Sequence, residues 1–118
     1  MAVQHYTGSC QCGAVAFEVD VDIASPIACN CSRCRRLGSI LAFAPRADFT
    51  LLRGEGATTE YLFNKGAIHH LFCSTCGIES FAFAKGRDGS DMVAVNVNCL
   101  DGVDPRALEF KVHDGAAA

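Results

Sequence analysis

The sequence predicts a mainly β protein of one domain, with metal-binding cysteine turns at the ends of its strands. Short stretches alternate between apolar and polar residues, and glycines or prolines separate them. No stretch of ten or more residues shows helical periodicity. Seven of the eight cysteines stand in three short clusters with the spacing of metal ligands. At 118 residues the chain is long enough to bury one core, so we expect a single domain over residues 1–118.

The first half of the chain contains three expected strands and one short helix. Residues 14–21 alternate as in a half-buried strand. The apolar members of that stretch share one face: Val15, Phe17, Val19 and Val21. Residues 32–37 favour a turn or a short helix, with Ser32 as its cap and Gly38 at its end. Two more strands are expected over residues 40–44 and 49–53.

In the second half, an expected hairpin leads into a cysteine turn. Residues 58–63 are rich in β-branched and aromatic side chains, and Asn64-Lys65-Gly66 is a turn signal that connects them to a strand over residues 68–72. That strand leads directly into Cys73 and Cys76. The last strands are expected over residues 81–84, 92–99 and 108–113, with a capped helical turn at Asp104-Pro105-Arg106.

The clustered cysteines divide into sets that match zinc coordination. Tetrahedral zinc takes four thiolates, or three with one open position that is typical of catalytic sites. Two distant pairs can form a closed site that ties the N-terminus to the middle of the chain: Cys10 and Cys12 with Cys73 and Cys76. The remaining cluster has three members: Cys29, Cys31 and Cys34. This division predicts two zinc ions per chain, one closed and one open.

Other divisions of the cysteines remain open at this stage. The three-cysteine cluster can recruit His69, His70 or Cys99 as a fourth ligand, which would give two closed, structural sites. Disulfide bonds are a further alternative. A reducing cytosol would instead keep the thiols available to metal.

An open site with three thiolates favours a particular chemistry. Three thiolates leave the zinc ion with a net negative charge, so the site is a weaker Lewis acid than one with three histidines and is less suited to making hydroxide. It suits the binding of a fourth thiolate from a substrate, held deprotonated at neutral pH. We therefore expect addition of a thiolate to a small electrophilic carbonyl, or the reverse elimination.

The three cysteine motifs also stand in a distinctive order. Gly8-Ser9-Cys10-Gln11-Cys12-Gly13 precedes Cys29-x-Cys31-x-x-Cys34, and Phe72-Cys73-x-x-Cys76-Gly77 follows. This order resembles the glutathione-dependent formaldehyde-activating enzyme family. The resemblance runs from about Tyr6 to Phe110, which gives the expected domain a core at about residues 6–110, and it includes Asn96-Val97-Asn98-Cys99-Leu100-Asp101. His70-Leu71-Phe72-Cys73 and Gly77-Ile78-Glu79-Ser80-Phe81 are similar to the branch that contains centromere protein V.

The resemblance carries expectations for fold and metal. It implies a β-tent fold of small antiparallel sheets with zinc knuckles. It implies a structural zinc on the two outer pairs, Cys10, Cys12, Cys73 and Cys76. It implies a catalytic zinc on Cys29, Cys31 and Cys34.

The resemblance also implies an activity. The family is named for a carbon–sulfur lyase reaction in which S-(hydroxymethyl)glutathione forms from, or reverts to, glutathione and formaldehyde. The expected partners are therefore a small-molecule thiol, glutathione, and a small aldehyde. The alternatives are a non-catalytic zinc-stabilised interaction module and glutathione-dependent handling of another small electrophile.

Several polar residues near the clusters in the sequence are candidates for substrate binding or proton transfer. Arg33, Arg35 and Arg36 are candidates to hold the carboxylates of a glutathione-like ligand, and a solvated basic face that offsets thiolate charge is the alternative. His69 and His70 point to opposite faces of a strand. His70 is the candidate proton carrier, against a partly buried structural histidine.

The strand expected over residues 92–99 contains further candidate residues. Cys99 stands at the end of the apolar face of this strand, which favours core packing over a role as a fourth zinc ligand or a reactive thiol. Asn96 and Asn98 share the polar face and line a pocket or lie on the surface.

Charge and hydropathy bear on partners and location. The formal net charge is −3, and two zinc ions bound by seven thiolates would bring it to about −6. This balance argues against nucleic-acid binding, which depends on neutralising phosphates. The N-terminus lacks the basic start and apolar run of a signal peptide, and no apolar stretch approaches the ~20 residues that span a bilayer. We expect a cytoplasmic protein with no membrane partner.

Overall fold

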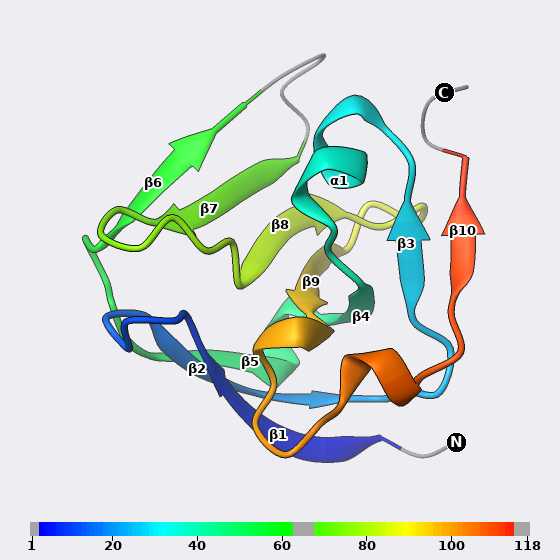
Figure 1. The fold of residues 1–118 in the computed structure, drawn as a ribbon, viewed down its shortest axis with the longest axis horizontal. Coiled ribbons are helices and arrows are strands. Elements are labelled where there is room, and N and C mark those ends of the chain that lie inside the picture. Colours follow the sequence, from blue (N-terminus) through cyan, green and yellow to red (C-terminus); the bar gives the residue numbers. More distant parts are fainter. Residues whose placement is uncertain (1–2, 63–67, 115–118) are drawn as a thin grey trace.

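The computed structural model describes residues 3–62 and 68–114 of the chain, and within them strands predominate (Figure 1). The strands are β1 (Gln4–Ser9), β2 (Ala16–Val21), β3 (Ile27–Cys29), β4 (Leu41–Pro45), β5 (Phe49–Arg53), β6 (Thr58–Tyr61), β7 (His69–Cys73), β8 (Phe81–Lys85), β9 (Asp91–Asn96) and β10 (Lys111–His113). The helical segments are α1 (Ser32–Leu37) and three 3-10 turns, η1 (Arg46–Asp48), η2 (Val97–Cys99) and η3 (Pro105–Ala107). The expected mainly β fold class is confirmed.

The strands form two sheets. The smaller sheet has the order β1-β2-β5 and is antiparallel, and the larger has the order β10-β3-β4-β9-β8-β7-β6. In the larger sheet β10 and β3 pair in parallel, and the other neighbours are antiparallel. Figure 1 shows β1 and β2 along one side of the molecule and α1 towards the opposite side. No helix among the described residues is long and apolar enough to cross a membrane.

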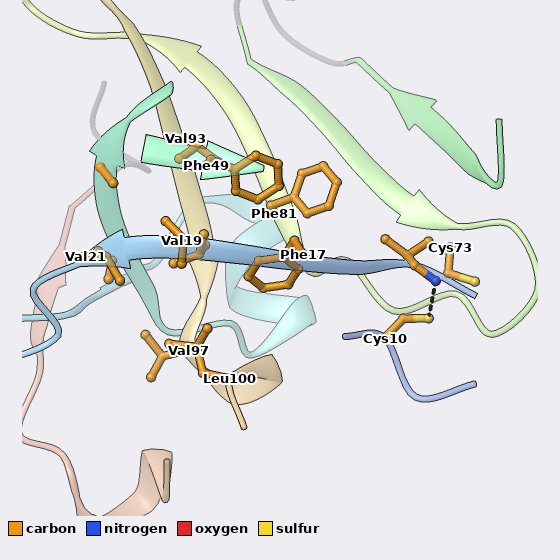
Figure 2. Packing of buried hydrophobic residues seen from close by; sticks show 14 residues of the cluster. Cys10, Phe17, Val19, Val21, Phe49, Cys73, Phe81, Val93, Val97 and Leu100 are labelled. Carbon is orange, nitrogen blue, oxygen red and sulfur yellow. Dashed lines mark hydrogen bonds between the residues drawn. The ribbon is translucent and has the colours of Figure 1, made fainter. Parts of the chain in front are cut away.

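The hydrophobic core lies between the two sheets (Figure 2). The alternating face expected of residues 14–21 is confirmed, because its apolar side chains are all buried: Val15, Phe17, Val19 and Val21. The Phe17 ring stacks on Phe49 at a centroid distance of 5.4 Å and meets the edge of Phe81 at 5.8 Å. These rings join the smaller sheet to the larger one and give the core its specific packing.

Two elements near the cysteines differ from the sequence expectation. Ser32 does not cap α1, because the Cys31 side chain takes that place and its Sγ accepts a hydrogen bond from the Cys34 N–H at 3.4 Å. The strand expected over residues 92–99 ends at Asn96, since the Asn96 side chain accepts from the Asn98 N–H and starts η2. The chain after Asn96 therefore turns instead of extending.

Strands β1 and β3 were not expected from the sequence. The side chains of β1 are mostly exposed, so the stretch lacks alternation, and pairing with β2 from Gln4↔Val21 to Ser9↔Ala16 holds it in the sheet. Strand β3 has three residues and is held between β4 and β10. Strand β10 is itself shorter than the expected 108–113. The helical turn capped by Asp104 is confirmed as η3, and the turn expected at Asn64-Lys65-Gly66 lies outside the described residues.

Candidate metal centres

The first cysteine cluster, here the four-cysteine cluster, joins two turns that are far apart in the sequence. Its members all have their sulfur atoms within 4.8 Å of one another: Cys10, Cys12, Cys73 and Cys76. The Sγ atom of Cys12 lies 3.7 Å from that of Cys10 and 3.6 Å from that of Cys73. Zn–S bonds of about 2.3 Å would give tetrahedral S–S edges of about 3.8 Å. The four thiols are free, and their spacing fits one tetrahedral zinc ion.

Each of the two turns closes on a glycine. Gly13 has a φ of 82° and donates its N–H to the Cys10 carbonyl, and Gly77 has a φ of 81° and donates to the Cys73 carbonyl. Both φ values lie in the left-handed region that glycine adopts without strain. The glycine after each pair thus lets the chain fold back over its two sulfur atoms.

Backbone N–H groups point at the sulfur atoms of the four-cysteine cluster. Figure 2 shows Cys10 and Cys73 together at one end of the core, where the Val15 N–H donates to the Cys10 Sγ at 3.3 Å. The N–H of Cys76 donates to the Cys73 Sγ at 3.4 Å. Backbone N–H groups of Ile78 and Cys12 lower the pKa of the Cys76 thiol to about 6. Such donors stabilise thiolates, the form that binds metal.

The second group, here the three-cysteine cluster, lies where β3 runs into α1. Cys29 ends β3, Cys31 caps α1, and Cys34 lies buried in the first turn of the helix, with all three sulfur atoms within 4.8 Å of one another. Burial raises the pKa of the Cys34 thiol. Burial also opposes ionisation of Cys31, but hydrogen bonds from the Cys34 backbone N–H and from the Cys34 and Cys29 thiols outweigh it and lower the pKa of the Cys31 thiol. This donor set also fits zinc.

The structure places the candidate fourth ligands in other contacts. Among the described residues, the second metal group contains three ligands and neither histidine nor Cys99. His69 is exposed and its Nδ1 lies 2.5 Å from Glu60 Oε1, whereas His70 is buried and its Nδ1 lies 3.1 Å from Glu79 Oε2. Cys99 packs against the core, as expected, and burial raises the pKa of its thiol.

The three candidate arginines differ in their surroundings. Arg33 is partly buried, with its guanidinium carbon 4.6 Å from the centre of the Tyr61 ring, and it forms an ion pair with Glu79. Arg36 is exposed and donates through Nη1 to the Ser32 carbonyl at 2.8 Å, and Arg35 is exposed. A pocket of about 390 Å³ lies beside α1, and its walls are formed by Ser32, Arg33, Arg36, Leu37 and Tyr61. The structure thus assigns two of the three arginines to this pocket.

Glu79 is the residue near the metal centres that sequence reasoning missed. It is 5% exposed, and its carboxylate contacts both Arg33 and His70. The available signal was an acidic residue inside the otherwise apolar or small stretch that follows Cys76. Asn96 is buried as well and donates to the Glu79 carbonyl at 3.1 Å, so the alternative of a surface position is wrong for it. Asn96 and Asn98 do line a second pocket of about 450 Å³.

Comparison with known proteins shows the family to which the chain belongs. The chain matches the family model described as glutathione-dependent formaldehyde-activating enzyme over residues 5–114. It is also similar to a Rhodobacter sphaeroides protein of known crystal structure, with 39% sequence identity and a TM-score of 0.82. That similarity covers 91% of this chain and 99% of the other. The chain therefore belongs to the glutathione-dependent formaldehyde-activating enzyme family.

Proposed function

We propose that this protein is a zinc-dependent carbon–sulfur lyase that forms or breaks S-(hydroxymethyl)glutathione. Its reactants are glutathione and formaldehyde, and its setting is the reducing cytoplasm, where thiols stay free. The whole chain, residues 1–118, acts as one zinc-binding domain. The four-cysteine cluster holds a structural zinc, and Cys29, Cys31 and Cys34 hold the zinc at which the reaction occurs.

The observation that carries this proposal is the number of ligands in the second cluster. Among the described residues, three cysteines form it, whereas the first cluster has a complete set of four. A set of three leaves room for a ligand from outside the protein, which is the arrangement of catalytic zinc sites. Zinc held by these three cysteines would offer an open coordination position, where direct bonding to the metal would stabilise the thiolate of a thiol substrate.

The pocket beside α1 supplies a place for the rest of the thiol molecule. Ser32 and Arg33 line it, and both stand between Cys31 and Cys34 in the chain. Arg36 is exposed at the pocket wall, where its guanidinium can pair with a carboxylate of glutathione. Leu37 and the Tyr61 ring provide apolar surface on which the peptide backbone of glutathione can pack.

The reaction we propose balances without an external oxidant or reductant. The thiol of glutathione loses its proton, its sulfur forms a bond to the carbonyl carbon of formaldehyde, and the C=O double bond becomes a C–O single bond. A proton then arrives at the oxygen to give the hydroxymethyl group. The reverse elimination breaks the same carbon–sulfur bond and returns the proton to sulfur.

His70 is the candidate carrier of that proton. A carboxylate accepts hydrogen bonds, so Glu79 orients the His70 ring with the hydrogen on Nδ1 and leaves Nε2 as the basic nitrogen. A His70→Gln variant should lower turnover, while metal content stays unchanged. Unaltered turnover would assign the proton transfer to water instead.

The direct test is an assay with glutathione and formaldehyde. Because the adduct forms spontaneously, the exchange rate between free and adduct-bound ¹³C-formaldehyde should be measured by NMR with and without protein. We expect the zinc-loaded protein to accelerate exchange and Cys31→Ala to abolish the acceleration. No acceleration by the zinc-loaded protein would contradict the proposal. Acceleration with another aldehyde alone would point to a different electrophile, and none with any aldehyde to a non-catalytic interaction module.

A further inference from the structure

Helix α1 carries two members of the three-cysteine cluster but has little to stabilise it by itself. It is six residues long, and Cys34 is its buried residue. Isolated helices shorter than about 12–15 residues are marginal in water. The position of α1, and with it the spacing of the Cys31 and Cys34 sulfur atoms, must therefore come from contacts with the rest of the protein.

The first of these contacts holds the N-terminal turn of α1. Arg33 donates from Nε at 3.3 Å and from Nη2 at 2.7 Å to the same oxygen, Oε1 of Glu79. The Arg33 side chain is 22% exposed and that of Glu79 is 5% exposed, so water screens the pair poorly. Charge-assisted hydrogen bonds with two donors are among the strong ones in proteins and fix geometry as well as distance.

A second contact holds the other end of the same helix. Asn98 donates from Nδ2 to the carbonyl of Gly38, the residue that ends α1, at 3.3 Å. The backbone N–H of Asn98 in turn donates to Oδ1 of Asn96 at 3.1 Å. Asn96 donates from Nδ2 to the backbone carbonyl of Glu79 at 3.1 Å. A continuous chain of hydrogen bonds therefore runs from the first turn of α1 through Glu79, Asn96 and Asn98 to its last turn.

This chain of hydrogen bonds is anchored at the turn of the four-cysteine cluster. The N–H of Cys73 donates to the carbonyl of Ile78, the residue before Glu79, at 3.0 Å. On the other side of Glu79, the Asn96 N–H donates to the Ser80 carbonyl at 2.8 Å. The backbone on both sides of Glu79 is thus fixed, so its carboxylate can impose a position on Arg33.

We propose that Glu79, Asn96 and Asn98 act as a clamp that positions α1 for metal binding by the three-cysteine cluster. Glu79 is the positioning residue with the largest effect, because it holds Arg33 between the two cysteines of the helix. This inference depends on the proposed function only in taking Cys29, Cys31 and Cys34 as metal ligands.

The test is a titration of the metal-free protein with Co²⁺, whose thiolate charge-transfer bands report binding at each cluster. We expect Glu79→Ala to lower the Co²⁺ affinity of the three-cysteine cluster by at least about tenfold, since residues that support metal ligands typically contribute 10–100-fold to metal affinity. The Co²⁺ affinity of the four-cysteine cluster should stay unchanged. Asn98→Ala should weaken the same cluster by a smaller factor. Glu60→Ala removes an exposed, His69-paired glutamate and is the matched control, with no effect expected at either cluster.

Two further variants separate positioning from general destabilisation. Arg33→Ala should reproduce the effect of Glu79→Ala, and the double variant should add little, because both remove one shared contact. Glu79→Gln keeps an oxygen that can accept from Arg33 and should recover part of the affinity. Arg33→Ala leaves the Glu79 carboxylate in contact with His70, so this variant provides the answer if Glu79→Ala does not fold.

The outcomes are distinct from those of the proposed function. Unchanged affinity of the three-cysteine cluster in both Glu79→Ala and Arg33→Ala would overturn the clamp, and so would an equal loss at both clusters. Wild-type protein that binds Co²⁺ at the four-cysteine cluster alone would overturn the clamp and the proposed function together. Selective weakening in the variants, without any formaldehyde exchange by the wild type, would support the clamp and contradict the lyase.

Discussion

The sulfur atoms of Cys12 and Cys73 lie 3.6 Å apart although 61 residues separate them in the chain. Cys12 belongs to the turn between β1 and β2 of the smaller sheet, and Cys73 ends β7 of the larger sheet. A metal ion bound at the four-cysteine cluster would therefore join the two sheets at one end of their shared core. The three-cysteine cluster, by contrast, lies within the larger sheet and its attached helix.

Substitutions in the two clusters should have different consequences for stability. Cys10→Ala removes a ligand that joins the sheets and should lower the Tm by at least about 10 °C, because structural zinc contributes directly to folding. Cys31→Ala should leave the protein folded and inactive. Differential scanning calorimetry of the zinc-loaded variants measures both effects. Equal unfolding by the two substitutions would contradict the division into a structural and an open site.

Removal of metal should proceed in two steps. A chelator should remove the ion from the three-cysteine cluster first. Three protein ligands with an open coordination position should bind zinc more weakly than four. The fold should survive this step and be lost with the second ion. Stopped-flow detection of released zinc, combined with circular dichroism, would show whether the fast release precedes the loss of structure. A single release phase that coincides with unfolding is the contrary result.

The stacked phenylalanines give a prediction for the core that does not involve metal. Phe17 is 0% exposed and packs on Phe49 and Phe81, so Phe17→Ala should cost about 3–5 kcal/mol in the free energy of unfolding. Phe43 is 47% exposed, and Phe43→Ala should change stability by about 0.5 kcal/mol or less. Urea denaturation of zinc-loaded protein compares the two. Similar losses would mean that the core is not where the structure places it.

His5 gives a prediction for the pH dependence of stability. A hydrogen bond that His5 donates to Asp20, together with the charges of Asp20 and Glu18, raises the pKa of His5 above 6.5. Its contribution is therefore fully present below pH 6.5 and is lost as the pH rises through the raised value. His5→Gln should lower the Tm at about pH 5.5 and have little effect at about pH 9. A Tm difference that grows with pH would refute this assignment.

The apolar strand was predictable because its signal is local: residues 14–21 alternate between buried apolar and more polar side chains. The short cysteine pairs are also local signals, and the need of zinc for four ligands indicated that the two distant pairs combine into one cluster. The sequence did not predict β1 and β3, since their stability comes from pairing with strands distant in the chain. Nor did it predict Cys31 as the cap of α1, because a cysteine sulfur is not a usual capping group.

The contacts around Glu79 were also beyond reach of the sequence. Glu79 and Arg33 are 46 residues apart, and nothing local to either residue indicates that they pair. The burial of Asn96 likewise depends on the Glu79 carbonyl that it contacts, not on its place in an alternating strand. Such polar contacts form only once the sheets have assembled, so they could not be predicted from the sequence.

In the proposed arrangement, one metal site is closed by four cysteines and the other is open to a substrate thiol. The absorption spectrum of protein carrying two Co²⁺ ions per chain, recorded during titration with reduced glutathione, tests this arrangement. We expect the thiolate bands of one ion to change with saturation while those of the other stay constant, and Cys31→Ala to abolish the change. Two Co²⁺ ions whose spectra are both indifferent to glutathione would contradict this arrangement.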